Sequence, residues 1–136
     1  MYLLDTNIIS ALRRPKLNPQ VVNWFSSIDE NAIFLSVVTI AELEQGIVRE
    51  RRKNAPYAEL LSQWLETTIS NYEERILPLT LNIARRWGRI SAAVGHDDAD
   101  IMIAAMALEH RFVVVTRNVR DFVPTGAKTF NPFGAV

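Results

Sequence analysis

Short apolar runs alternate with longer amphipathic segments along this chain. Four of the runs are typical of buried strands, because each is short, rich in apolar residues and bounded by polar residues; they lie at residues 2–4, 33–35, 76–77 and 112–115. A weaker fifth run lies at residues 128–130. The alternation of strands with helices favours a parallel sheet that is covered by helices on both faces.

The segments between these runs show the spacing of amphipathic helices. The predicted helices span about residues 7–14, 19–28, 36–52, 56–71, 80–94 and 98–110. In the last of them Asp98 stands at the position of an N-cap, and the final turn is rich in His110 and Arg111. The prediction is an α/β fold with three layers, in which a central parallel sheet of four to five strands lies between helices, and residues 1–136 form a single domain.

The composition narrows the class of protein further. A chain of 136 residues that is 49% hydrophobic can form one domain with a sizeable core. The sequence has no cysteine, which excludes disulfides and thiolate metal sites and suits a reducing cytosol. It has no apolar run of about 20 residues and no signal-peptide pattern, so we expect a cytoplasmic protein that does not enter the membrane.

The net charge gives no general attraction to nucleic acid, since 15 Lys and Arg balance 15 Asp and Glu. Basic residues gather locally at 49–53 and at 85–89. Each of these runs is interpreted on its own as a solvated helix face or helix end.

Acidic and amide side chains follow the predicted strands. In an open α/β sheet, ligands bind at the carboxyl ends of the strands, beside the starts of the following helices. Asp5 directly follows the first strand, and Glu42 lies one or two turns into the helix after the second. The others begin the helix before the fourth strand or come just after that strand, and they are Asp97, Asp98, Asp100, Asn118 and Asp121.

Each acid also has a structural interpretation. Asp5 can cap the first helix, Asp98 can cap the helix at 98–110, and Asp121 can pair with Arg117 or Arg120. Glu42 is different, because it stands among apolar residues where an unpaired carboxylate is costly to bury. We therefore expect Glu42 to be partly buried beside a charged or metal partner.

Carboxylates that are held close together repel one another, which raises their pKa values unless a cation lies among them. Oxygen ligands without cysteine select a hard divalent ion such as Mg²⁺ or Mn²⁺. Such an ion binds phosphate oxygens and lowers the pKa of a bound water. The acids therefore predict metal-dependent hydrolysis of phosphodiester bonds.

Several segments together carry a resemblance to a known family. They are LLDTN at 3–7, TIAEL at 39–43, DADIMIAAMA at 98–107, VVTRNVRDF at 114–122 and the closing FNPF at 130–133. In this order they resemble the PIN-domain ribonucleases, and within them the VapC toxins of bacterial toxin–antitoxin pairs, especially the FitB-like branch. The matching segments extend from one end of the chain to the other.

The resemblance implies which residues form the site. The metal-binding and catalytic acids would be Asp5, Glu42 and Asp100, with Mg²⁺ as the cofactor and Mn²⁺ as its alternative. The polar residues that orient these acids would be Thr6, Asn7 and Thr39.

The chain departs from the family pattern after the fourth strand. Many relatives carry an acid directly after the Thr116–Arg117 pair, where this chain has Asn118. An amide can still coordinate an ion or hold a water, but it removes one negative charge. Asp121 is the candidate for the missing catalytic carboxylate, and Thr116 is expected to point its hydroxyl at the site. Arg117 and Arg120 are the candidates for binding substrate phosphates.

The resemblance also implies partners. VapC-like proteins cleave RNA, form homodimers, and are neutralised by a cognate VapB-like antitoxin that binds operator DNA through its own domain. An antitoxin segment would lie over the acidic groove and present an arginine to it.

Other functions fit the sequence less well. A phosphatase with Asp5 as nucleophile lacks its usual second Asp two positions later, where Asn7 stands. Dinucleotide binding lacks the glycine-rich turn. A regulator that keeps the acids but has lost turnover, prompted by Asn118, stays open as the alternative function.

Overall fold

The computed structural model describes residues 1–134 and confirms the predicted alternation of strands and helices. The strands are β1 (Tyr2–Leu4), β2 (Ile33–Ser36), β3 (Ile76–Leu77), β4 (Val113–Val115) and β5 (Thr129–Phe130). The α-helices are α1 (Thr6–Leu12), α2 (Pro19–Ser26), α3 (Val37–Arg51), α4 (Ala55–Tyr72), α5 (Leu81–Val94), α6 (Ala99–His110) and α7 (Val119–Phe122). Short 3₁₀ turns lie at Pro15–Leu17, Glu30–Ala32, Glu73–Arg75 and Val123–Thr125.

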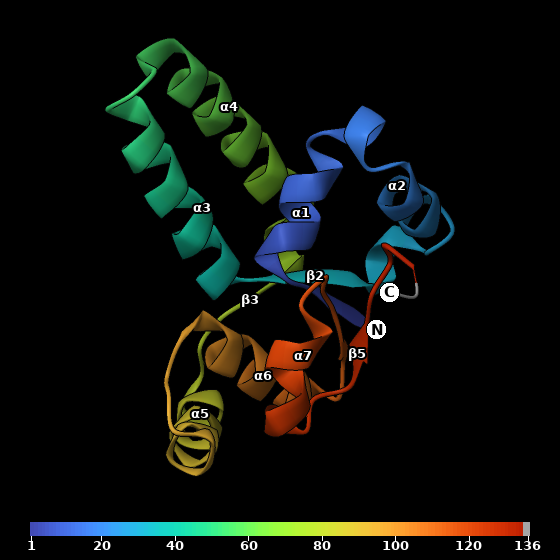
Figure 1. The fold of residues 1–136 in the computed structure, drawn as a ribbon, viewed down its shortest axis with the longest axis vertical. Helices are drawn as coiled ribbons and strands as arrows, with labels where there is room; N and C mark the ends of the chain where they lie inside the picture. Colours follow the sequence, from blue (N-terminus) through green and yellow to red (C-terminus); the bar gives the residue numbers. More distant parts are fainter. Residues whose placement is uncertain (135–136) are drawn as a thin grey trace.

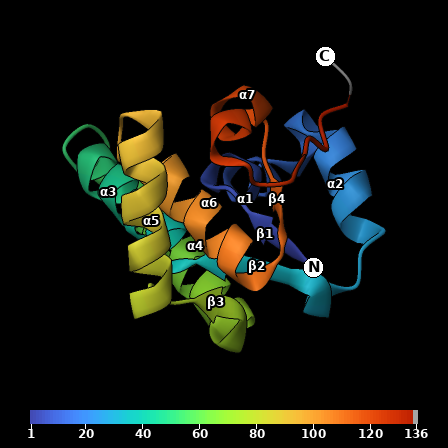
Figure 2. The same ribbon diagram turned by 90° about the horizontal axis from the view of Figure 1, so that it is seen from below.

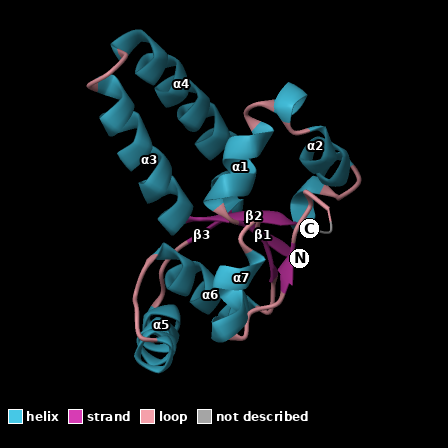
Figure 3. Cartoon of the chain, viewed as in Figure 1, coloured by secondary structure: helices cyan, strands magenta, loops and turns pink. Residues whose placement is uncertain are grey.

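The strands form one parallel sheet in the order β3-β2-β1-β4-β5. Figure 1 shows α1 to α4 on one side of this sheet and α5 to α7 on the other. Colouring by secondary structure makes the single layer of strands between the helices clear (Figure 3). The predicted three-layer α/β fold is therefore confirmed.

Alternate residues of the central strands pack under opposite helical layers. Leu3 and Val114 belong to the core beneath α5 and α6, whereas Leu4 and Val115 belong to the core beneath α1 and α2. All four side chains are fully buried. Both faces of the sheet are covered, which explains why these strands are continuous apolar runs in the sequence.

The chain changes direction across the sheet between β1 and β4. From β1 the chain adds β2 and then β3 on one side of the sheet. Helices α5 and α6 then lead to β4, which pairs with the other side of β1. Figure 2 shows α6 lying between α5 and α7 on this return. A position where neighbouring strands lead to helices on opposite faces is where open α/β sheets bind their ligands. Here it lies between the ends of β1 and β4, where the Asp5 amide donates to the Val115 carbonyl (2.9 Å).

One local prediction is wrong in detail, and one short helix was missed. Asp98 stands at the N-cap position of α6, but its side chain makes no capping hydrogen bond and instead lies 3.1 Å from Nδ1 of His96. It is Asp5 that caps a helix with its side chain, because its carboxylate accepts a hydrogen bond from the Thr6 amide and α1 begins there. Helix α7 was not predicted, since four residues are too few to show a helical period.

The helices of residues 1–134 are too short or too polar to cross a lipid bilayer.

Candidate metal centre

Asp5 is the most buried acid at the carboxyl edge of the sheet, with 4% of its surface exposed. One carboxylate oxygen accepts a hydrogen bond from the Thr6 amide (2.8 Å). The other accepts from the Thr116 hydroxyl (2.8 Å) and the Asn7 side-chain amide (3.2 Å). Three donors from α1 and from the end of β4 thus fix the orientation of the carboxylate.

The residues that hold Asp5 also tie the β4–α7 loop to α1. The fully buried Thr116 hydroxyl accepts a hydrogen bond from the Asn118 amide (2.9 Å) while it donates to Asp5. The Asn7 side-chain oxygen accepts from the Arg117 amide (3.2 Å). The loop that carries Arg117 and Asn118 is therefore positioned by the same groups that orient the acid.

Glu42 approaches this centre from α3. The Ser36 hydroxyl caps that helix by accepting from the Thr39 amide (3.1 Å), and Glu42 follows one turn later. The Thr6 hydroxyl donates to the half-buried Glu42 carboxylate (2.6 Å) and lies 3.1 Å from the buried Thr39 hydroxyl. The predicted partial burial is confirmed, but the partner in the structure is a neutral hydroxyl rather than a charge.

Asp100 lies in the first turn of α6 and is half-buried. Its pKa is raised to about 6, first by burial and then by the negative charges of Asp5, Asp98, Asp121 and Glu42, in that order. Four acids from separate parts of the chain thus raise the pKa of the same carboxyl group. The structure brings together the acids that the sequence placed at the ends of separate strands.

The pKa of Asp5 is also raised, and the main cause is its burial. The hydrogen bonds from Thr116 and Thr6 oppose this by stabilising the charged form, while the charges of Glu42 and Asp121 add to the increase. A buried carboxylate with raised pKa and fixed orientation is stabilised when a cation binds beside it.

The donor set is suited to a hard divalent ion, because it consists of carboxylate, hydroxyl and amide oxygens. Within residues 1–134, no three acidic, histidine or cysteine side chains gather tightly enough to hold an ion by themselves. Mg²⁺ does not require such a cage, since it keeps several waters and binds through one or two carboxylates. Asp5 and Asp100 fit that role, and the predicted role of Glu42 as a third ligand stays a prediction.

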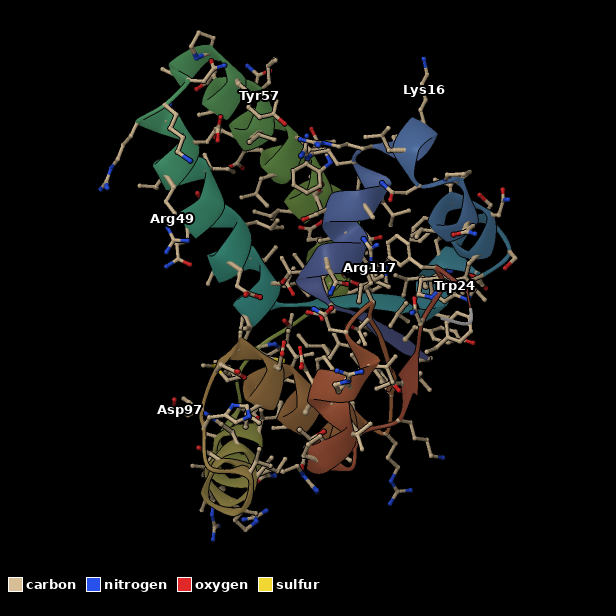
Figure 4. The ribbon with its side chains drawn as sticks, in the orientation of Figure 1. Lys16, Trp24, Arg49, Tyr57, Asp97 and Arg117 are labelled. Carbon is tan, nitrogen blue, oxygen red and sulfur yellow. The ribbon has the colours of Figure 1, made fainter. Side chains whose placement is uncertain are left out.

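The predicted substrate arginines lie just after β4, Arg117 in the connecting loop and Arg120 in α7. Arg117 and Arg120 are exposed, and residues 117–121 line a shallow pocket of about 320 Å³. The Arg117 guanidinium carbon lies 4.6 Å from the centre of the Phe133 ring. Figure 4 shows Arg117 between α1 and α7, close to the edge of the sheet that carries Asp5. Asp121 is exposed, and within residues 1–134 it forms no ion pair with either arginine.

Sequence reasoning missed a second basic group beside the site. Arg13 and Arg14 follow α1, the helix that Asp5 caps, and both line a pocket of about 310 Å³ that also contains Thr6 and Glu42. The sequence could have indicated this group, because two adjacent arginines directly follow α1, the helix that begins at the candidate ligand Asp5. The basic run 49–53, in contrast, lies at the far end of α3, where Figure 4 shows Arg49 pointing away from α4.

Comparisons with known proteins agree with this geometry. The family model described as PIN domain matches residues 2–125. Toxin FitB of Neisseria gonorrhoeae is 36% identical over 142 residues, which cover 98% of this chain and 99% of the relative. VapC ribonuclease Y4jK of Sinorhizobium fredii is 29% identical and covers 98% of each chain. A solved structure described as FitAB bound to an IR36 DNA fragment superposes with a TM-score of 0.86 at 32% identity, over 100% of this chain and 98% of the other.

Proposed function

Because the chain belongs to the PIN domain family, we propose that it is a metal-dependent ribonuclease that acts as the toxin of a toxin–antitoxin pair. The observation that carries the proposal is the oriented Asp5 carboxylate, which shares the carboxyl edge of the sheet with Asp100 and Glu42. The relative named as a VapC ribonuclease supports the reaction, and the relative named Toxin FitB supports the biological role.

Each residue of the site would have a separate role in phosphodiester hydrolysis. Asp5 and Asp100 would hold Mg²⁺ or Mn²⁺, and Glu42 would complete the acidic set. When bound, such an ion would supply Lewis-acid stabilisation of charge on phosphate oxygens and would lower the pKa of a bound water. Thr6 and Thr116 fix the carboxylates by donating to them, which prevents the acids from turning away when charge develops.

The polar residues after β4 would act on the substrate side of the centre. Asn118 stands where the family resemblance implies an acid, and its amide can hold a water or an ion through oxygen. Asp121 raises the pKa values of Asp5 and Asp100 through its charge, so it is close enough to influence bound cations and water. Arg117 and Arg120, which line the same pocket, would bind RNA phosphates.

The same proposal includes an antitoxin as the protein partner. The solved structure of FitAB with DNA supports an assembly in which a VapB-like antitoxin contacts operator DNA and this chain binds the antitoxin. With a net charge of zero, this chain has little general attraction for duplex DNA of its own.

We also propose that the chain forms a homodimer. Large apolar side chains are exposed where β3 leads into α5, with Leu79 41% and Leu81 75% exposed. Val37 at the start of α3 is 36% exposed and lines a pocket with Leu79. Sedimentation at micromolar concentration tests this, and a monomer throughout would contradict it.

Cleavage of labelled RNA by the purified chain tests the catalytic proposal. We expect cleavage with Mn²⁺ or Mg²⁺, none with a chelator, and none by Asp5→Asn or Asp100→Asn. Asp97→Asn is the matched control, because Asp97 is an exposed acid near the start of α6 and should leave cleavage unchanged. Cleavage by Asp5→Asn at the rate of the parent would contradict the site. An inert parent that still binds its antitoxin would favour the alternative, a regulator without turnover.

A further inference from the structure

A groove leads away from the candidate metal centre toward α4. Thr6 and Glu42 line one end of the pocket of about 310 Å³, and Tyr57 and Trp64 line it from α4. Helices α1 and α3 form its other walls. The groove therefore reaches the candidate centre at Glu42, whose carboxylate accepts from Thr6.

Two arginines converge on one phenol in this groove. Arg13 and Arg14 each donate a hydrogen bond to the Tyr57 hydroxyl oxygen, at 2.9 and 3.1 Å. The Arg13 guanidinium carbon also lies 5.9 Å from the centres of both the Tyr57 and Trp64 rings. Figure 4 shows Tyr57 on α4.

The positive charge of this arginine pair is not neutralised by an ion pair within residues 1–134. Glu50 lines the same pocket, yet neither guanidinium is salt-bridged to it, and both use a neutral phenol as acceptor. A guanidinium has five donors, and the hydrogen bond to Tyr57 occupies one of them in each arginine. The two positive charges lower the pKa of Tyr57, mainly through the hydrogen bonds from Arg14 and Arg13. The pair therefore presents free donors and positive charge to an anion.

Helix α1 sets the distance between this pair and the acids. Asp5 is the N-cap of α1 and Arg13 is its C-cap, so their backbones are separated by about 12 Å at roughly 1.5 Å per residue. A ligand that contacts both the acids and the arginine pair must therefore extend along the length of α1.

We propose that Arg13 and Arg14, held together by Tyr57, bind a backbone phosphate of single-stranded RNA away from the bond that is cleaved, at the opposite end of α1 from Asp5. The inference rests on the proposed ribonuclease function. Planar guanidinium groups match phosphate oxygens, and aromatic rings beside them suit the stacking of an unpaired base. An acidic protein segment in the groove is the rival occupant.

Binding is measured without cleavage, so that the site is tested separately from the reaction. Fluorescence anisotropy with a labelled single-stranded oligoribonucleotide of about 12 nucleotides, in chelator, gives the affinity of the full chain at salt concentrations of about 50 to 200 mM. The test variant is Arg13→Gln/Arg14→Gln. The matched control is Arg49→Gln/Arg52→Gln, which removes the same charge from exposed positions on the far end of α3.

We expect the test variant to bind this RNA at least about tenfold more weakly than the control variant, because it cannot form the charge-assisted hydrogen bonds to phosphate. The slope of log affinity against log salt should become shallower by about 0.7 for each phosphate that the variant no longer neutralises. Arg13→Lys/Arg14→Lys keeps the charge and should keep most of the slope. If the glutamine pair fails to fold in a thermal melt, the lysine pair and the single Arg14→Gln, whose side chain is exposed, give the same comparison.

The outcomes separate the two proposals. Arginine-dependent binding without cleavage under any divalent ion would contradict the ribonuclease function and leave the RNA site standing. Cleavage by the parent, with equal affinity and slope in the test and control variants, would overturn the RNA site alone. Unchanged RNA binding together with abolished antitoxin binding would overturn it as well and assign the groove to the protein partner.

Discussion

Asp100→Asn is expected to stabilise the metal-free protein at neutral pH. The pKa of Asp100 is about 6 in the folded chain against an ordinary value of 3.8, because the group is half-buried among other acids. The folded state therefore binds more protons than the unfolded state between these values. By linkage, the free energy of unfolding of the parent falls as the pH rises from about 4 to about 6, and the loss is complete above that range.

The magnitude follows from the size of the shift. A shift of about 2 pKa units corresponds to about 3 kcal/mol as an upper bound, at roughly 1.36 kcal/mol per unit. Asp100 is only half-buried, so solvent screening reduces this to about 1–2 kcal/mol. The variant also loses the favourable interaction of the Asp100 charge with the start of α6, which offsets up to about 1 kcal/mol of this gain. The net expectation is about 1 kcal/mol in favour of Asp100→Asn above pH 6.

Chemical denaturation in chelator, followed from pH 4 to pH 8, measures this difference. The parent and the Asp100→Asn variant should be nearly equal at the acidic end and separate as the pH rises. Asp97→Asn, an exposed acid beside the same helix, should follow the parent throughout. A variant that is less stable than the parent at pH 7, or a difference independent of pH, would refute the claim that burial and the neighbouring acids destabilise the charged form of Asp100.

Three further changes probe other parts of the structure. Thr6→Val removes the hydroxyl that donates to Glu42, so we expect metal affinity to fall about 10- to 100-fold in a Mn²⁺ titration by calorimetry, and an unchanged affinity would contradict the supporting role. Asn118→Asp adds a carboxylate beside the centre and should tighten Mn²⁺ binding in the same assay, whereas weaker binding would place residue 118 outside the site. Ile103→Ala creates a cavity under the sheet and should cost about 2–5 kcal/mol of unfolding free energy by urea denaturation, and a cost below about 1 kcal/mol would mean that α6 packs loosely.

The strands and the acids at their ends could be predicted because each signal is local. The run Tyr2–Leu4 is typical of a buried strand, and Asp5 directly follows it. The parallel-sheet rule then places Asp5, Glu42 and Asp100 at one edge without any knowledge of their contacts. Because both faces of the sheet are buried, the central strands are continuous apolar runs, and the positions where they end can be located in the sequence.

The contacts that complete the site could not be predicted from local patterns. Arg13 meets Tyr57 across 44 residues, because α4 folds back along α3 toward the end of α1. The Thr6–Glu42 hydrogen bond likewise depends on the position of α3 relative to α1. Asp98 has the right residue type for a cap, but its carboxylate contacts His96 instead of the helix amides. In each case the contact depends on how the helices pack in the fold, or on which of several nearby groups a side chain binds.

The position of Mn²⁺ in crystals of this chain, found from its anomalous scattering, tests the account most directly. We expect one ion within about 2.1 Å of carboxylate oxygens from Asp5 and Asp100, with waters completing its coordination. The peak should be absent from Asp5→Asn crystals that keep the fold. Mn²⁺ bound elsewhere, or a protein that cleaves RNA with no ion between Asp5 and Asp100, would contradict the account.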